Sequence, residues 1–149
     1  MIRKLQTTDI DCVAEIWLST NTKTHVFIPL QYWLDNYAAV REQLAQAEVY
    51  VYETEGSIRG FIGLIDDYIA GIFVQYQAQS NGVGKELLDF VKRLRKELWL
   101  NVYQKNVRAI NFYLREGFKI QREGADEDTG EKDYLMAWTQ WQQSTDRPL

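Results

Sequence analysis

The amino-acid sequence predicts a mixed α/β fold, a single domain over residues 1–149 with a mixed central sheet and about four flanking helices. A length of 149 residues suits one domain, and a hydrophobic content of 46% is ordinary for a folded chain. Residues 49–74 are rich in β-branched and aromatic side chains and contain turn signals, which predicts an antiparallel meander. Over 69–103 a strand, an amphipathic helix and a second strand follow one another, and this crossover requires parallel strands.

Two helices are expected before the first long strand. Thr8 is suited to an N-cap with an acid three residues later, and apolar side chains then recur at helical spacing, which predicts a helix over about 8–19. A polar link over 19–24 separates it from a second helix, which Pro29 can open. The apolar side chains on one face of that second helix are Leu30, Trp33, Leu34, Tyr37, Val40 and Leu44.

The meander comprises three expected strands, at 49–54, 57–65 and 68–74. Glu55-Gly56 and Asp66-Asp67 lie between them and are turn signals. The three strands are therefore expected to pair in antiparallel order without a helix between them.

Beyond residue 74 the pattern alternates between helix and strand. A helix begins at Gly82-Val83-Gly84 and keeps its apolar spacing to Leu98, where a strand over 98–103 is expected. Asn106 can cap a further helix, and Gly117 stands where a C-terminal glycine is expected. The last elements are a hairpin with strands at 118–121 and 134–139, the acidic loop 126–131 between them, and a polar tail from Gln140.

Composition disfavours several classes of function. A net charge of -4 gives no field that would hold a polyanion, so a nucleic-acid partner is not expected. Cys12 is the one cysteine, which excludes an internal disulfide, and no set of His and Cys has metal-ligand spacing. The N-terminus lacks a signal-peptide stretch and no apolar run has membrane-spanning length, so we expect a cytoplasmic protein without a membrane partner. A monomer and a homodimer are both compatible with the sequence.

A glycine-rich turn lies between the third strand of the meander and the helix that follows. Gly82 and Gly84 have no Cβ, so backbone N–H groups there can approach a phosphate, and the helix adds its positive N-terminal end. A Walker-type loop is disfavoured because Glu86 stands where Ser or Thr is needed. A dinucleotide-binding turn is disfavoured because Leu87 stands where a third glycine is needed. A tight turn that binds nothing remains the alternative.

Two motifs together resemble the GNAT superfamily of N-acetyltransferases. Gln79-x-x-Gly82-x-Gly84 resembles the pyrophosphate-binding motif of that family, Gln/Arg-x-x-Gly-x-Gly/Ala. Residues 106–118 resemble its signature Asn-x-x-Ala-x-x-Phe-Tyr-x-x-x-Gly-Phe at every marked position. The order of elements over about 1–139 is similar to the single-domain GNAT fold, and the sequence most resembles small bacterial members, some of which acetylate protein lysines.

The resemblance implies an acetyl-CoA-dependent N-acetyltransferase that moves an acetyl group onto a primary amine by direct attack, with acetyl-CoA as co-substrate and no metal. It also implies that the parallel strands 69–74 and 98–103 splay apart. The pantetheine arm would lie between them and pair with the backbone of Phe73 and Val74. The residues implied to hold the pyrophosphate are Gln79, Asn81, Gly82, Val83, Gly84 and Lys85.

Three residues receive further roles from the resemblance. The N–H of Val74 would face the thioester oxygen, where negative charge develops during attack. Tyr113 would be the general acid that protonates the leaving thiolate, with plain packing as its alternative. Asn106 would bind the pantetheine arm as well as cap its helix. Cys12 is expected on a distant helix, so no acetyl-enzyme is expected.

The sequence departs from the family pattern at the turn. Tyr76 stands where the family often has Pro, which loosens a turn preference without removing a donor. Ser80 and Asn81 stand where other members often carry basic residues. The cofactor is therefore expected to bind with less charge assistance.

The amine acceptor is less well defined than the cofactor. His25, Phe27 and Tyr32 are expected to line its site, although a lone histidine is also a common structural residue. The acidic loop 126–131 is either a solvated turn or a segment that attracts a basic substrate. The possible general bases are Glu53, Asp66, Asp67 and His25.

The identity of the acceptor stays open between a protein lysine, a protein N-terminus and a small amine such as a polyamine, an aminoglycoside or an amino acid. A protein that senses acyl-CoA without turnover is the alternative from another class. A structural subunit whose glycine turn binds nothing is a third.

Overall fold

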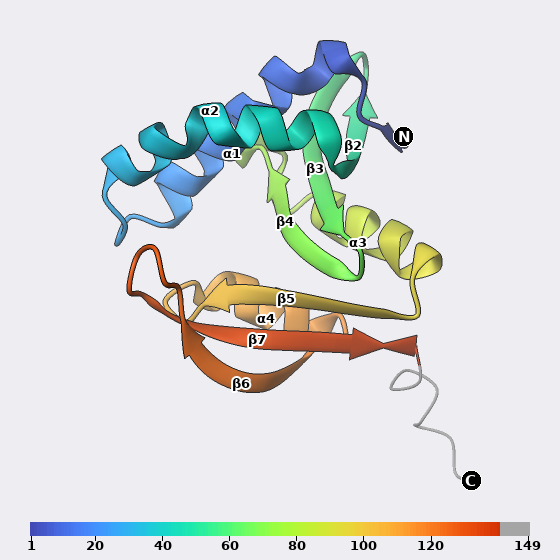
Figure 1. The fold of residues 1–149 in the computed structure, drawn as a ribbon. Helices are drawn as coiled ribbons and strands as arrows, with labels where there is room; N and C mark the ends of the chain where they lie inside the picture. The colour runs from blue at the N-terminus through green and yellow to red at the C-terminus, as the bar shows by residue number, and fades with distance from the viewer. Residues whose placement is uncertain (141–149) are drawn as a thin grey trace, which may run out of the picture.

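The computed structural model describes residues 1–140, in which a seven-stranded sheet carries four α-helices (Figure 1). Beyond Gln140 itself, the expected polar tail lies outside the described residues. The elements are β1 (Ile2–Lys4), α1 (Ile10–Thr24), α2 (Leu30–Gln46), β2 (Glu48–Thr54), β3 (Ser57–Ile65), β4 (Tyr68–Val74), α3 (Val83–Leu94), β5 (Glu97–Tyr103), α4 (Val107–Arg115), β6 (Lys119–Ala125) and β7 (Lys132–Thr139), with short 3-10 turns at Thr7–Asp9 and Tyr76–Ala78.

The strands lie in the order β1-β2-β3-β4-β5-β7-β6, and every neighbouring pair is antiparallel except β4 and β5. Strands β2, β3 and β4 form the expected meander. Helix α3 crosses from β4 to β5, and such a crossover makes that pair parallel. The predicted mixed sheet is therefore confirmed.

Strands β4 and β5 meet only at one end. Tyr68 is paired with Trp99, whose N–H donates to the carbonyl oxygen of Asp67 at 2.9 Å, and within residues 1–140 no other ladder pair joins the two strands. Beyond this bridge the strands diverge (Figure 1). The divergence separates an N-terminal half, β1–β4 with α1 and α2, from a C-terminal half, β5–β7 with α4 (Figure 1).

Two apolar clusters stabilise the two faces of the sheet. Side chains alternate along β2, so Val49 and Val51 pack with α1 and α2 while Tyr50 packs with α3. The α3 cluster extends through β5 and β7 and includes Leu87 and Trp138, which are 0% and 1% exposed. Because helices cover both faces here, the apolar residues of the meander form nearly continuous runs.

Helix α1 differs from its prediction at both ends. Asp9 rather than Thr8 is the N-cap, without a side-chain cap bond to α1; its carboxylate instead accepts the N–H of Gln6 at 2.8 Å across the preceding 3-10 turn. The prediction of a polar link over 19–24 is wrong, since these residues belong to the helix. The side chains of Thr20 and Asn21 donate to helix carbonyl oxygens at 2.6 and 2.9 Å, which lets polar residues continue the helix.

Other elements also differ from their prediction. Helix α3 ends at Leu94 and not near 98, because Arg95 has an extended backbone (φ -136°, ψ 151°). Strand β6 runs to Ala125 rather than 121; all of its residues are exposed, so no alternation signals it. Strand β1 spans three residues and was not predicted. None of the helices in the described part of the chain is long and apolar enough to cross a bilayer, and the cytoplasmic location stays a prediction.

Candidate active site

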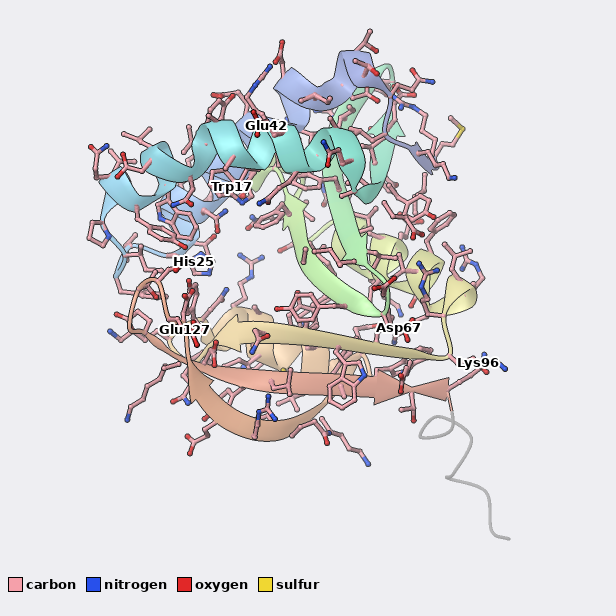
Figure 2. All side chains as sticks on the ribbon, viewed as in Figure 1. Trp17, His25, Glu42, Asp67, Lys96 and Glu127 are labelled. Atoms are coloured by element: carbon pink, nitrogen blue, oxygen red, sulfur yellow. The ribbon has the colours of Figure 1, made fainter. Side chains whose placement is uncertain are left out.

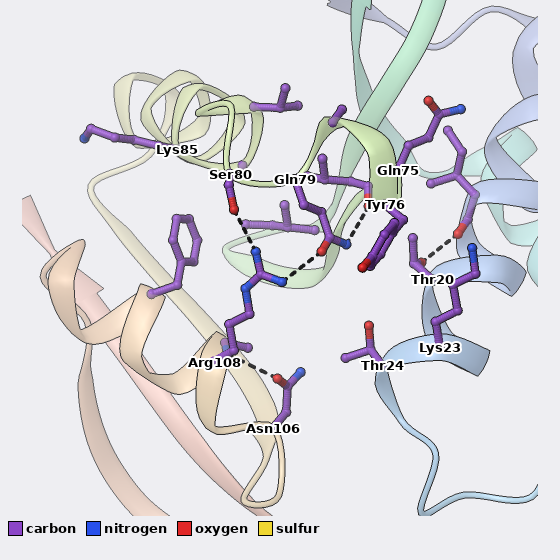
Figure 3. Close-up of a pocket in the computed structure, with 18 of the residues that line it drawn as sticks. Thr20, Lys23, Thr24, Gln75, Tyr76, Gln79, Ser80, Lys85, Asn106 and Arg108 are labelled. Atoms are coloured by element: carbon purple, nitrogen blue, oxygen red, sulfur yellow. Dashed lines mark hydrogen bonds between the residues drawn. The ribbon is translucent and has the colours of Figure 1, made fainter.

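A cavity of about 1280 Å³ lies beside the turn that joins β4 to α3 (Figure 3). Its walls come from α1, from the segment between the end of β4 and the first turn of α3, and from α4. Thr20, Lys23 and Thr24 lie on the α1 side, and Asn106 and Arg108 lie on the α4 side (Figure 3). The cavity therefore lies between the two halves of the fold, where β4 and β5 have diverged.

The turn before α3 offers backbone donors to this cavity. Gly82 is the N-cap of α3 and has φ 83°, a left-handed conformation that glycine adopts without strain. The first helical hydrogen bond runs from the N–H of Glu86 to the oxygen of Gly82 at 3.0 Å. The N–H groups of residues 83–85 thus have no acceptor within the helix. These donors and the helix dipole suit an anion such as a pyrophosphate.

Arg108 reaches this turn from α4. Its NH1 donates to Gln79 Oε1 at 3.0 Å and its NH2 donates to Ser80 Oγ at 3.1 Å (Figure 3). Both acceptors are neutral, and within residues 1–140 no carboxylate pairs with Arg108. Lys85, by contrast, is paired with two carboxylates, of which Glu116 lies 3.0 Å away. Arg108 therefore brings an uncompensated positive charge to a turn whose own residues 80 and 81 are neutral.

The end of β4 presents its backbone to the gap between the halves. Val74 faces Gly60 in the ladder, and the N–H of Gln75 donates to the oxygen of Arg59 at 2.8 Å. This pattern makes Val74 a non-hydrogen-bonded position, and Ile72 has the same phase. The N–H and C=O groups of both residues therefore point away from β3, toward the space that β5 has left.

Phe73 lies in the opposite phase, which corrects the expectation that its backbone binds the pantetheine arm. It faces Phe61 as a hydrogen-bonded pair, and the two rings pack with centroids 5.1 Å apart. Phe73 does not border the cavity, whereas Ile72 does. At Val74 the carbonyl oxygen accepts from Gln79 Nε2 at 3.0 Å, and the N–H remains directed into the gap.

Tyr113 lies on α4 with its ring packed between those of Phe112 and Phe118, at centroid distances of 5.3 and 5.6 Å. It is 9% exposed and borders the cavity. Burial raises the pKa of Tyr113 well above its usual range, so the phenol keeps its proton at neutral pH. Within the described part of the chain its hydroxyl has no hydrogen-bond partner. A protonated phenol with a free donor is what a general acid requires.

Asn106 caps α4 and also borders the cavity. Its Oδ1 accepts the N–H of Ala109 at 3.2 Å, and its Nδ2 lies 3.2 Å from His25 Nε2. The predicted cap is therefore confirmed, and Gly117 follows the helix with φ 93° as expected.

The three residues expected around the acceptor amine do not border this cavity. His25 packs between Trp33 and Tyr103, with centroids 5.7 and 5.0 Å away, and both of its ring nitrogens are hydrogen-bonded. Burial lowers the pKa of His25 to about 4. Phe27 packs on the same rings, and Tyr32 packs edge-on against Trp33. His25 thus belongs to an aromatic cluster and is not placed as a free general base.

The acidic groups near this cluster include one that the sequence did not single out. Asp133 is 8% exposed and has no ion pair or side-chain hydrogen bond within residues 1–140. It faces Tyr103 across the β5–β7 ladder, and the hydroxyl of Tyr103 donates to Asp126 Oδ2 at 2.6 Å. Burial, and then the charge of Asp126, raises the pKa of Asp133. Of the carboxylates expected as bases, Glu53 is paired with an arginine at 3.0 Å, and neither it nor Asp66 or Asp67 borders the cavity. Asp126 and Asp133 do not border it either.

Cys12 is closer to the site than expected. It lies on the first turn of α1, is exposed, and borders the same cavity. Burial of part of the side chain and the charge of Asp9 raise the pKa of its thiol, which disfavours the thiolate that an acetyl-enzyme would need. Among residues 1–140 no three His, Cys, Asp or Glu side chains are grouped to hold a metal ion.

Comparisons with known proteins agree with this geometry. The acetyltransferase (GNAT) domain family matches residues 45–120. Peptidyl-lysine N-acetyltransferase YiaC of Escherichia coli strain K12 is 36% identical over 140 residues, which cover 93% of this chain and 96% of the relative. Peptidyl-lysine N-acetyltransferase YjaB of the same strain is 27% identical over 130 residues, 87% of this chain and 88% of the relative.

Solved structures show the same fold. The solution structure of apo-form YjaB from Escherichia coli superposes with a TM-score of 0.83 at 25% identity, over 93% of this chain and 96% of that one. A putative streptothricin acetyltransferase from Bacillus anthracis, solved with acetyl coenzyme A, superposes with a TM-score of 0.57 at 24% identity over 62% of each chain. From the family match, the identity to YiaC and the cavity between diverging strands, we conclude that this chain belongs to the GNAT family of acetyl-CoA-dependent N-acetyltransferases.

Proposed function

We propose that this acetyltransferase moves the acetyl group of acetyl-CoA directly onto the side-chain amine of a lysine in a protein or peptide. The observation that carries the proposal is that a glycine turn with free N–H groups, an unpaired backbone N–H on β4 and the buried phenol of Tyr113 meet at one cavity. The lysine acceptor is supported by YiaC and YjaB, both named peptidyl-lysine N-acetyltransferases.

The residues of the cavity fit CoA along its length. The pyrophosphate would be held by the N–H groups of residues 83–85 and by the guanidinium of Arg108. The amide groups of the pantetheine arm would pair with the backbone of Ile72 and Val74, as a strand would in place of β5. The Nδ2 of Asn106 has a second N–H for the same arm, because only one is directed at His25.

The chemistry requires one bond to form and one to break. The lysine ammonium first loses a proton to solvent or a base. The neutral amine nitrogen then attacks the thioester carbon, the C–S bond breaks, and the nitrogen loses a second proton to solvent or a base. The N–H of Val74, which the register of β4 directs away from β3, would stabilise negative charge on the carbonyl oxygen. Tyr113 gives its phenolic proton to the departing thiolate and is reprotonated from solvent. The burial that raises the pKa of Tyr113 would also raise the pKa of a thiol beside it, so both pKa values would shift in the same direction.

Acidic groups beside the aromatic cluster of His25 and Tyr103, outside the cavity lining, would favour a cationic substrate. Asp126 and Asp133 lie on the C-terminal half of the sheet with the hydroxyl of Tyr103, and Asp133 lacks a counter-charge among residues 1–140. An ammonium that approached this group would relieve the cost of an unpaired buried carboxylate. A lysine side chain has such an ammonium on a long apolar stem.

Acetylation of a panel of amines tests the proposal. Lysine peptides, a peptide with only its N-terminus free, a polyamine and an aminoglycoside are each incubated with the protein and acetyl-CoA, and the products are mapped by mass spectrometry. Acetyl-lysine in the peptides, absent with Tyr113→Phe, is the expected result. Acetylation of the small amines alone would replace the protein-lysine acceptor by the small-molecule alternative. Binding of acetyl-CoA without turnover on any amine would favour an acyl-CoA sensor.

A further inference from the structure

A directed chain of side-chain hydrogen bonds joins α1 to α4. His25 Nδ1 lies 2.9 Å from Asn21 Oδ1, and His25 Nε2 lies 3.2 Å from Asn106 Nδ2. At one end Asn21 Nδ2 donates to the oxygen of Trp17 at 2.9 Å, and at the other Asn106 Oδ1 accepts the N–H of Ala109 at 3.2 Å. Figure 2 shows His25 between the helix that carries Trp17 and the loop that carries Glu127.

The two ends of this chain fix the direction of every bond in it. The N–H of Ala109 can only donate, so Asn106 must present Oδ1 to it and Nδ2 to His25. The oxygen of Trp17 can only accept, so Asn21 must present Nδ2 to it and Oδ1 to His25. His25 must therefore accept at Nε2 and donate from Nδ1. Only the neutral Nδ1–H tautomer satisfies both demands.

The surroundings hold the imidazole in this state. The rings of Trp33, Tyr103 and Phe27 lie 5.0 to 5.7 Å from it and fix its plane. Asn21 is 3% exposed, so water does not compete freely for its side chain. The low pKa of His25 agrees with a ring that stays neutral near physiological pH.

The hydrogen-bond chain through His25 also spans the open end of the gap between the N-terminal and C-terminal halves of the fold. At the other end of β4 the halves are joined by the Tyr68–Trp99 bridge, after which the strands diverge. The bond between His25 and Asn106 connects the end of α1, in the N-terminal half, to the start of α4, in the C-terminal half. The cavity lies between these two connections, so the chain helps to set its width.

We propose that His25 is a positioning residue, which holds the Asn106 amide so that the second N–H of Nδ2 is directed into the cavity toward the pantetheine arm of CoA. The inference rests on the proposed binding of acetyl-CoA in this cavity. Without the acceptor at Nε2, the Asn106 amide would keep its cap to Ala109 but lose the contact that fixes the direction of Nδ2. The His25 ring does not border the cavity and would act through Asn106.

Two variants separate the hydrogen bonds of His25 from its packing. His25→Phe keeps an aromatic ring and removes both bonds, whereas His25→Gln keeps one donor and one acceptor. Thr22→Ala is the matched control. It removes a side-chain hydrogen bond to a carbonyl oxygen of α1 that is not part of the hydrogen-bond chain through His25. Thermal unfolding of each variant shows which proteins remain folded at the assay temperature.

Equilibrium binding and kinetics give the decisive comparison. His25→Phe is expected to raise the Kd and KM for acetyl-CoA about three- to tenfold, the effect of one hydrogen bond, with a smaller change in the KM for the lysine peptide. Adenosine 3′,5′-diphosphate, which has no pantetheine arm, should bind wild type and variant equally. His25→Gln should restore most of the affinity for acetyl-CoA.

The outcomes distinguish this inference from the proposed function. If wild type binds no acetyl-CoA, the proposed function itself fails. If wild type binds it and folded His25→Phe binds it equally well, or loses adenosine 3′,5′-diphosphate to the same extent, His25 does not position Asn106. His25 is the one histidine of the chain, so ¹⁵N NMR of the labelled imidazole reports its tautomer directly. A dominant Nε2–H tautomer would overturn the proposal.

Discussion

Replacement of Arg108 by Gln tests whether the positive charge at the phosphate turn comes from α4. Arg108 is exposed, borders the cavity, and donates to Gln79 and Ser80 at 3.0 and 3.1 Å without a carboxylate partner within residues 1–140. Its charge is therefore free to act on a bound anion. In Arg108→Gln both acceptors can bond to water, so the free energy of unfolding is expected to change by about 0.5 kcal/mol or less.

The expected loss of cofactor affinity follows from the value of one charge-assisted contact. Hydrogen bonds to charged groups contribute about 1.5 to 3 kcal/mol, and the exposure of Arg108 places its contribution near the lower value. Since about 1.4 kcal/mol is a factor of ten, Arg108→Gln should raise the Kd for acetyl-CoA about tenfold. The dependence of Kd on salt concentration should become shallower, because one cation no longer faces the phosphates.

Isothermal titration calorimetry at two salt concentrations measures both effects. Lys96→Gln is the control, because it removes the same charge at the end of the sheet away from the cavity (Figure 2). Its Kd for acetyl-CoA should equal that of wild type. An unchanged Kd in Arg108→Gln would refute the assignment. An equal loss in Lys96→Gln would show that net charge, and not a local contact, is responsible.

Four further predictions concern other parts of the site. Tyr113→Phe should lower kcat about 100-fold or more and leave the Kd for acetyl-CoA unchanged, as measured by thiol release and calorimetry; a normal kcat would remove Tyr113 from the mechanism. His25 has a pKa of about 4 when folded against 6.5 ordinarily, so the unfolded chain binds the proton more readily. The free energy of unfolding should thus fall by up to about 1.4 kcal/mol per unit as the pH is lowered from 6.5 to 4, as measured by urea titrations. The same pH dependence in His25→Phe would contradict this. Asp133→Asn should raise Tm, since it removes an unpaired buried charge, yet lower kcat/KM for a lysine peptide; a lower Tm would mean that Asp133 has a stabilising partner. Gly82→Ala should lower the free energy of unfolding by about 1 kcal/mol because φ at this position is 83°, and it should also weaken the binding of acetyl-CoA. An unchanged free energy of unfolding would contradict the left-handed turn.

The parts of the fold with strong local signals could be predicted from the sequence. The meander, the crossover helix and the capped helix α4 follow from side-chain periodicity, turn residues and caps, which act over a few neighbours. The glycine turn and Asn106 could be placed for the same reason. Strand β6 gave no such signal, because every residue in it is exposed.

The remaining features of the site depend on tertiary structure. The hydrogen-bond phase of β3 and β4 decides whether Ile72 or Phe73 turns its backbone to the cavity. The apolar sequence of β4 does not reveal this phase, because it would be the same in either case. Arg108 stands two residues after the Asn106 cap, but only the packing of α4 beside the turn shows that it reaches Gln79. The unpaired state of Asp133 is likewise visible only once its neighbours are placed.

We expect the cavity beside the Gly82 turn to bind acetyl-CoA. Thermal unfolding with acetyl-CoA, and with NAD and ATP as controls, tests it most directly. A ligand at a hundred times its Kd adds about 2.7 kcal/mol to the free energy of unfolding, which raises Tm by several degrees for a domain of this size. The account predicts this rise with acetyl-CoA alone. A folded protein whose Tm does not respond to acetyl-CoA, or responds equally to NAD or ATP, would contradict it.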